Sequence, residues 1–302
     1  MMLCCACCGI AEGDDIKLKT CTACKSARYC SVKCQKEHRP QHKRACKKRA
    51  AELRDELLFK QPESTHYGDC PICCLPLSLD KHKSLMSPCC SKRICYGCVH
   101  ANQRREEEMR LKKSCPFCRH PLPKSQEQAK MIIMERVATI DPVALNRMGS
   151  IHLNDGDHDT AFEYWTKATG LGDLASHYNL SLLYRDGHGV EKDEKMEVYH
   201  LEQAAICGHP FARFNLANVE WNNGRKERAI KHWIIAATLG DDDAVKYLRQ
   251  RYPRFVCKED FAVALRAHQA AIDATKSLQR EAATEYAIRN NINGQGGSTS
   301  VP

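Results

Sequence analysis

The chain has no long run of apolar residues. Its best stretches, Met131–Met134 and Ile234–Thr238, fall far short of the ~18 residues that a membrane-spanning helix needs. The first lysine is Lys17, and no apolar segment of useful length precedes it, so we expect neither a membrane span nor a secretory signal peptide. The expected location is therefore the cytoplasm, the nucleus or both, where thiols stay reduced.

Cysteine is almost missing from the second part of the chain. Of 20 cysteines, 18 lie between Cys4 and Cys118, and only Cys207 and Cys257 lie beyond. In a reducing compartment, clustered cysteines bind metal more often than they form disulfides. The sequence thus predicts a metal-organised front part and a back part that folds by ordinary core packing.

The back part repeats with a period of 32 to 36 residues. Gly172, Gly208 and Gly240 each follow an alanine by four residues, and a leucine follows each glycine by eight. Periods of this size indicate a solenoid of helix pairs. Two segments read A-x-x-x-W-x-x-A-x-x-x-G and resemble SEL-1-like repeats of the tetratricopeptide superfamily: Ala161–Gly172 and Ala229–Gly240. The resemblance implies an adaptor scaffold without catalytic residues.

The first cysteine block, residues 1–50, contains four ligand pairs. They are Cys5-x2-Cys8, Cys21-x2-Cys24, Cys30-x3-Cys34 and His42-x3-Cys46. Two or three intervening residues let both side chains of a pair reach one tetrahedral zinc ion. The pattern from Tyr29 to Cys46 resembles the MYND zinc finger, and the match spans the block. In that family the pairs interleave, which implies one zinc ion at Cys5, Cys8, Cys30 and Cys34 and another at Cys21, Cys24, His42 and Cys46.

Some positions of the first block leave alternatives open. Cys4 and Cys7 offer the same spacing one residue earlier, although Gly9 directly after Cys8 favours the Cys5/Cys8 frame. His38 is expected to be a surface residue near the site. The resemblance also implies binding of proline-containing peptides from partner proteins, with Arg39 standing where the family usually has tryptophan.

The second cysteine block, residues 66–124, again contains four pairs: Cys70-x2-Cys73, Cys89-Cys90, Cys95-x2-Cys98 and Cys115-x2-Cys118. Their order and spacing resemble a RING finger, in which pairs one and three hold one zinc ion and pairs two and four hold another. The implied sets are Cys70, Cys73, Cys95 and Cys98, and Cys89, Cys90, Cys115 and Cys118. Four zinc ions per chain are therefore expected in the two blocks together.

The second block departs from the usual RING pattern at its second site. The family commonly has a histidine where Lys92 stands, and the adjacent pair Cys89-Cys90 strains a shared tetrahedral site. The residues that could substitute as ligands are His82, His100 and His120, and Cys74 is a spare thiol.

A RING finger positions a ubiquitin-charged conjugating enzyme and does no chemistry on the substrate itself. The resemblance implies apolar contacts to that enzyme from Ile72 and Pro116 and a bridging cation at Arg119. Two functions follow as alternatives, a RING-type E3 ubiquitin-protein transferase or a non-catalytic adaptor that binds partner peptides. No residue of this chain is expected to be catalytic in either case.

The net charge of +9 lies in the front part, since residues 1–130 carry 26 basic and 14 acidic side chains. Zinc-bound cysteines are thiolates, so filled metal sites would largely neutralise this excess, and nucleic acid is not expected to be a partner. The expected fold is multidomain, with two small zinc-organised α+β modules followed by an all-α helical-repeat solenoid. Beyond the two blocks, we expect a helical linker at 51–65, repeats at 126–255, one C-terminal helix at 256–289 and a disordered tail at 290–302.

Overall fold

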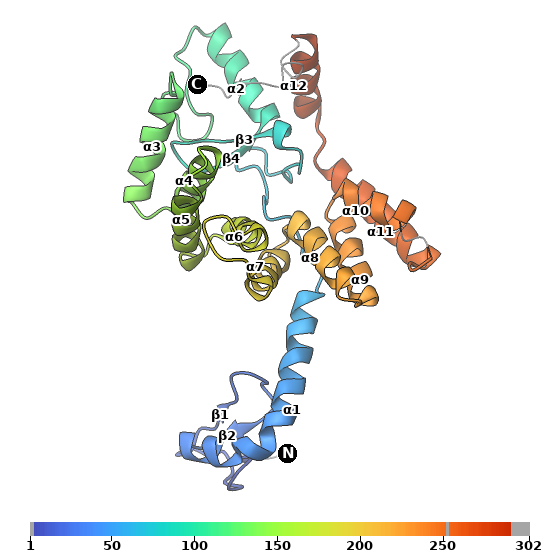
Figure 1. Ribbon diagram of the computed structural model, residues 1–302. Coiled ribbons are helices and arrows are strands. Elements are labelled where there is room, and N and C mark those ends of the chain that lie inside the picture. Colours follow the sequence, from blue (N-terminus) through green and yellow to red (C-terminus); the bar gives the residue numbers. More distant parts are fainter. Residues whose placement is uncertain (1–2, 252–253, 291–302) are drawn as a thin grey trace. The chain divides into compact units, whose positions relative to one another are not determined.

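The computed structural model describes residues 3–251 and 254–290 (Figure 1). The chain forms two compact units, which meet in sequence at Lys60 and Gln61. Apart from Asn290, the tail that was expected to be disordered lies outside the described residues. Within the described residues, no helix has both the length and the apolar character that crossing a membrane requires.

The first unit contains the first cysteine block and one long helix. Strands β1 (Lys19–Thr20) and β2 (Arg28–Tyr29) pair antiparallel, with Lys19 opposite Tyr29. The N-cap of helix α1 (Val32–Leu58) is Ser31, whose hydroxyl accepts a hydrogen bond from the Cys34 N–H at 3.2 Å. This is an ordinary N-cap, which satisfies one of the free donors at a helix start.

The helical linker expected at 51–65 is helical as far as Leu58, but residues 51–58 are the last turns of α1 and so continue the helix of the first block. No glycine or proline interrupts the sequence between Pro40 and Leu58. Arg49 also forms ion pairs with Glu52 at 3.1 Å and Glu56 at 2.8 Å along the exposed side of the helix. Continuous helix-forming residues therefore extend α1 past the boundary that we placed at residue 50.

The second unit starts with the second cysteine block, a small α+β module. A short 3₁₀ turn, η1 (Lys81–Lys83), leads into strand β3 (Ser84–Met86), which pairs antiparallel with β4 (Arg93–Cys95). Helix α2 (Tyr96–Glu108) follows directly. The core of the block is small and consists largely of cysteines, together with Leu77, Ile94 and Val99. So little apolar volume is typical of a module that depends on bound metal for stability.

The remaining helices form the repeat solenoid. The helices from α3 to α9 are 13 residues long each, and α10 and the π-helical turn η2 are shorter. The bounds are α3 (Gln126–Ala138), α4 (Pro142–Asn154), α5 (His158–Gly170), α6 (Leu174–Asp186), α7 (Glu194–Ile206), α8 (Pro210–Asn222), α9 (Lys226–Thr238), α10 (Asp242–Lys246) and η2 (Tyr247–Arg251). The fold class expected from the sequence is thereby confirmed.

In the solenoid core, a small residue on one helix packs against a large residue on the next. Trp165 of α5 and Trp233 of α9 occupy equivalent positions and are fully buried, and Leu201 of α7 is buried at the corresponding position of the middle repeat. Gly149 lies so close to Trp165 that an added Cβ would sit 2.6 Å from the indole Nε1. The small residue thus makes room for the large one on the neighbouring helix.

The C-terminal helix expected at 256–289 is two helices. They are α11 (Lys258–Ala274) and α12 (Leu278–Arg289), and Ser277 caps the second by accepting a hydrogen bond from the Arg280 N–H at 3.3 Å. The extended backbone of Ser277 breaks the helix, since an N-cap residue is itself not helical. Helix α12 then packs against α2 of the second block.

The second block and the solenoid form one compact unit, although we expected them to be separate domains. Arg136 of α3 donates to the Cys89 carbonyl at 3.3 Å, and Arg147 of α4 donates to the Met86 carbonyl at 2.6 Å. On the α8 side, the His66 N–H donates to the Gly208 carbonyl at 3.0 Å. Helices far along the chain therefore support the loops of the second block.

Candidate metal centres

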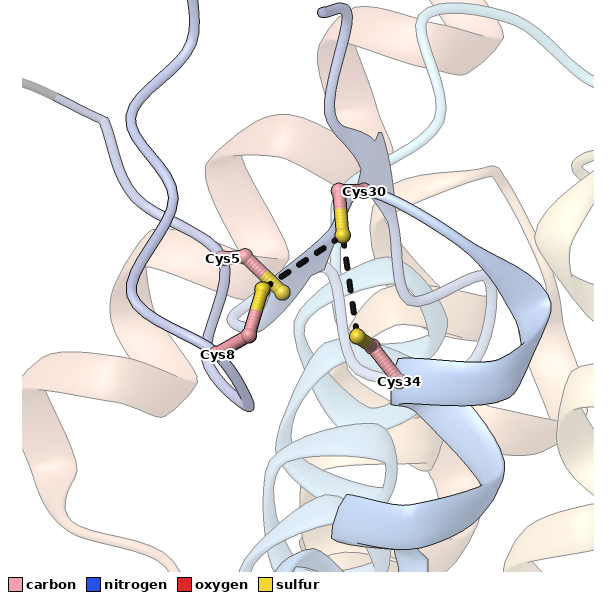
Figure 2. Close-up of side chains that lie close together, drawn as sticks. All are labelled: Cys5, Cys8, Cys30 and Cys34. Carbon is pink, nitrogen blue, oxygen red and sulfur yellow. Dashed lines mark hydrogen bonds between the residues drawn. The ribbon is translucent and has the colours of Figure 1, made fainter.

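Four sets of side chains each bring four ligand atoms within 4.8 Å of one another. In the first set, which Figure 2 shows, the side chains of Cys5, Cys8, Cys30 and Cys34 point toward a common centre. The Sγ atom of Cys30 lies 3.6 Å from that of Cys8 and 3.6 Å from that of Cys34. A tetrahedral ion with Zn–S bonds of about 2.3 Å has S···S edges of about 3.8 Å, so these separations fit zinc.

The second set joins the other two ligand pairs of the first block. Cys24 Sγ lies 3.3 Å from His42 Nε2, and Cys21 Sγ lies 3.8 Å from Cys46 Sγ. All four side chains are buried. His38 does not join them, because its ring stacks on that of His42 with centroids 5.6 Å apart and its Nδ1 pairs with the Tyr29 hydroxyl.

The third and fourth sets lie in the second block. In the third set, Cys70 pairs with Cys98 at 3.9 Å and Cys73 with Cys95 at 3.7 Å. In the fourth set, Cys90 pairs with Cys115 at 3.9 Å and Cys118 with Cys89 at 3.3 Å. All four sets are the ones that the MYND and RING resemblances imply, and none of the 20 cysteines forms a disulfide.

A shared backbone turn presents the paired thiols. In four of the five C-x2-C ligand pairs, all except Cys95-x2-Cys98, the residue after the second cysteine has a positive φ and donates its N–H to the carbonyl of the first cysteine, at 2.8–3.0 Å. These residues are Gly9, Lys25, Cys74 and Arg119. The closed turn points both sulfurs to one side, which is what a tetrahedral site needs. Cys74 therefore shapes the loop, and it lies outside the third set.

The same turn explains the adjacent pair Cys89-Cys90. The Ser91 N–H donates to the Ser87 carbonyl at 3.0 Å, and φ of Ser91 is +53°. Ser87 thus takes the place of the first cysteine of a C-x2-C loop, and Cys90 takes the place of the second. Cys89, one residue earlier in the same turn, still brings its sulfur into the fourth set. The S-x2-C spacing was a sequence signal for this loop that our reading missed.

The three histidines named above as alternative ligands for this site all lie outside the fourth set. His82 lies in η1, where its backbone N–H bonds to Asp80. The ring of His100 packs on Tyr286 of α12, with centroids 4.7 Å apart, and His120 Nδ1 pairs with the Pro121 carbonyl. The fourth set therefore consists of thiols alone.

Backbone hydrogen bonds favour the ligand form of several thiols. Bonds from the backbone of Cys8 and Cys30 lower the pKa of the Cys5 thiol to about 6, and the backbone of Cys24 lowers the pKa of Cys21. A thiolate binds metal and a thiol does not. These N–H donors would also be the outer partners of a bound zinc ion's sulfurs.

The first set has a close neighbour in Cys7. Its thiol lies 3.8 Å from a Glu37 carboxylate oxygen, and both come within 4.8 Å of Cys34 Sγ. Cys4 and Cys7 are not part of the first set, which consists of the residues of the Cys5/Cys8 frame.

The residues expected to contact a conjugating enzyme lie at the second block's surface. Ile72 is 41% exposed, and Pro116 is half-buried beside Phe117, which is 43% exposed and was not singled out from the sequence. Arg119 is exposed, but its Nη1 donates to Asn102 Oδ1 of α2.

Comparisons with known proteins agree with two of the three resemblances. Residues 5–46 match the family described as MYND finger, and residues 142–173, 174–209 and 211–241 each match the Sel1 repeat. No curated protein matches the chain. The second block has no family match among these findings, so its RING likeness rests on its cysteines.

Two solved structures are similar to the chain. One is c5321, a protective antigen of uropathogenic Escherichia coli with an SLR fold, at 22% identity and a TM-score of 0.40; the match covers 60% of this chain and 38% of that protein. The other is a Sel1 repeat protein of Oxalobacter formigenes, at 26% identity and a TM-score of 0.36, covering 39% and 96%. The family matches themselves show that the chain combines a zinc-binding MYND finger with three Sel1 repeats, both of which are protein-interaction modules.

Proposed function

We propose that the chain is a zinc-organised scaffold that holds four zinc ions and that its second block positions a charged ubiquitin-conjugating enzyme. Four sets of ligand atoms at tetrahedral spacing support the four ions. Each bound ion supplies folding free energy to a segment with little apolar core. Native mass spectrometry of the reduced protein tests the stoichiometry, and two ions or fewer would contradict it.

One observation carries the ligase proposal. Ile72 lies in the loop of the third ligand set and Phe117 in the loop of the fourth, and both large apolar side chains are more than 40% exposed. A buried position would suit packing, whereas exposed apolar side chains on metal-fixed loops suit a partner surface. The metal holds the loops rigid, so the contact can orient the partner's thioester without taking part in the chemistry.

Lysine discharge from a panel of charged conjugating enzymes tests this proposal. Ile72→Ala should weaken enzyme binding by the ~1–3 kcal/mol typical of an interface anchor. The matched control is Leu111→Ala, since Leu111 is 46% exposed and lies after α2, outside the ligand loops. Equal lysine discharge by the wild type and Ile72→Ala would contradict the proposed contact between Ile72 and the conjugating enzyme.

A non-catalytic adaptor is the second candidate, and Arg119 is the observation in its favour. The bond from its guanidinium to Asn102 ties the last ligand loop to α2, so this cation already has an internal structural partner. As a bridge to ubiquitin, Arg119 would have to leave Asn102. Arg119→Ala should therefore reduce discharge and leave enzyme binding unchanged if the block is a ligase. With all zinc sites filled, a lack of discharge by the wild type across the panel favours the adaptor.

The other modules would supply partners in either case. The MYND finger is proposed to bind proline-containing peptides, and the Sel1 repeats are proposed to present the surface that recruits a substrate or partner protein. The dense clustering of 18 cysteines between Cys4 and Cys118, in sets with metal-ligand spacing, supports the proposed location in the reducing cytoplasm or nucleus. Titration of the full chain with proline-containing peptides, before and after zinc removal, tests the role of the finger.

A further inference from the structure

Helix α12 inserts one arginine into the third ligand set from almost the other end of the chain. The guanidinium of Arg280 donates from Nη2 to Cys73 Sγ at 3.3 Å and to the Leu75 carbonyl at 3.1 Å. Its Nη1 donates to the Pro76 carbonyl at 2.6 Å. One planar cation thus contacts a ligand sulfur and two carbonyls of the loop that follows it, a geometry that the rigid fork of arginine can satisfy.

The same helix also holds the other half of the third set. Gln279 donates to the Gly97 carbonyl at 3.1 Å, between the ligands Cys95 and Cys98. A Cβ at Gly97 would lie 2.8 Å from Arg280 Cγ and 3.1 Å from its backbone, so glycine is what permits this approach. Gln279 and Arg280 therefore contact the segments that carry both ligand pairs of the third set, although these pairs are more than 20 residues apart in sequence.

The charge of the site gives this contact a chemical consequence. Four thiolates around one Zn²⁺ carry a net charge of −2, and a guanidinium in hydrogen-bond contact offsets part of it. A hydrogen-bonded thiolate is also a weaker nucleophile toward electrophiles and competing ligands. The fourth set is a natural comparison, because Arg280 bonds to none of its four sulfurs among the contacts of the described residues.

We propose that Arg280 is a positioning residue of the Cys70, Cys73, Cys95 and Cys98 site, and that its contact with Cys73 sets how slowly this site releases zinc and reacts with electrophiles. The inference rests on the zinc occupancy proposed above. It adds a residue of α12 to the surroundings of the site. The zinc retention of the second block would then depend on the last helix of the described residues.

The test uses the full-length, zinc-loaded protein. Limited alkylation by iodoacetamide, read cysteine by cysteine by peptide mass spectrometry, is combined with zinc release to a chromogenic chelator. Arg280→Ala should speed alkylation of Cys73 and the release of one zinc ion by about 10-fold or more, as outer-shell substitutions at metal sites commonly do. Cys89 and Cys118 of the fourth set should react as in the wild type.

Matched variants separate the thiolate contact from simple docking of α12. Gln279→Ala loses a helix contact without touching a sulfur, and Arg289→Ala removes an exposed arginine of the same helix that pairs only with Glu285 at 3.6 Å among its described contacts. Arg289→Ala should behave as the wild type, Gln279→Ala should accelerate zinc release less than Arg280→Ala does, and Arg280→Lys should give an intermediate rate. Gly97→Ala leaves the arginine in the sequence but displaces it, so it should reproduce much of the Arg280→Ala effect.

Two results would overturn the proposal. One is an unchanged Cys73 reactivity in a folded Arg280→Ala protein, and the other is an equal acceleration by Gln279→Ala, which would reduce the role of Arg280 to docking. If Arg280→Ala does not fold, Gly97→Ala and Arg280→Lys replace it in the test, and an unchanged Cys73 reactivity in both would overturn the proposal. A failure of the zinc proposal is seen separately, because native mass spectrometry of the wild-type protein would then find two ions or fewer before any variant is compared.

Discussion

The imidazole rings of His66 and His209 stack with their centroids 3.8 Å apart. His66 begins the second block, and His209 is the N-cap of α8, where its Nδ1 accepts a hydrogen bond from the Ala212 N–H at 3.2 Å. Burial, together with the nearby charge of Arg93, lowers the pKa of His66 to about 3, and burial lowers the pKa of His209 well below its usual range. Two neutral histidines thus join the second block to the solenoid.

This stack predicts a loss of stability in mild acid. Because the folded-state pKa of His66 lies below its ordinary value of about 6.5, the unfolded chain binds the proton more readily. The stabilisation is complete above that ordinary value and is lost as the pH falls toward the folded value. Between about pH 7.5 and 5.5, His66 should account for about 1.4 kcal/mol of lost unfolding free energy.

Urea unfolding of the reduced protein at the two pH values measures this loss. His66→Phe keeps an aromatic ring in the stack but cannot be protonated, so its stability should fall less than that of the wild type over the same range. An identical decrease in both proteins would show that other groups carry the acid sensitivity.

A second prediction concerns the close contact between Gly149 and Trp165. Gly149→Ala forces the buried indole to move and should cost about 1–3 kcal/mol of unfolding free energy, as overpacked cores do. Gly170→Ala is the control, since Gly170 ends α5 and a Cβ there meets no atom within 4 Å. That variant should be neutral or slightly stabilising. Thermal unfolding followed by circular dichroism compares the two, and equal melting temperatures would refute the packing argument.

A third prediction distinguishes the two ligand frames at the N-terminus. Cys8→Ser should lose one zinc ion, because Cys8 lies in the first ligand set. Cys7→Ser should keep all four, because Cys7 contacts Glu37 beside that set. Native mass spectrometry counts the ions. A full complement in Cys8→Ser and a loss in Cys7→Ser would establish the alternative frame of Cys4 and Cys7.

A fourth prediction concerns metal removal. Chelation should leave most of the helical circular dichroism of the solenoid, which contains no ligand set in its described residues. It should nevertheless lower the melting temperature of that signal, because Arg136 and Arg147 lose ordered carbonyl partners in the second block. A docking loss of roughly 2 kcal/mol corresponds to about 4–8 °C for a unit of this size. An unchanged melting temperature would mean that the block and the solenoid are energetically independent.

The ligand sets and the repeats could be predicted from the sequence because both depend on the spacing of residues that lie close together along the chain. Two residues between Cys21 and Cys24 are enough to direct two sulfurs to one ion, whatever the rest of the chain does. Likewise, each repeat buries its apolar face against its neighbour, so the period of Gly172, Gly208 and Gly240 already describes the packing. The resemblance then supplied the interleaving of the pairs, which spacing alone leaves open.

Other features depend on contacts between distant residues, and only the tertiary structure decided them. The continuation of α1 past residue 50 and the break at Ser277 reflect a balance of small local energies that no periodic pattern marks. The role of Ser87 became visible only when its carbonyl was found bonded to Ser91. Arg280 lies more than 200 residues from Cys73, and folding brings the two into contact. The sequence by itself therefore determined which residues can hold metal and which helices repeat, because those depend on neighbours along the chain. The structure decided what surrounds each site, because a counter-charge acts through space and its position follows from the whole fold.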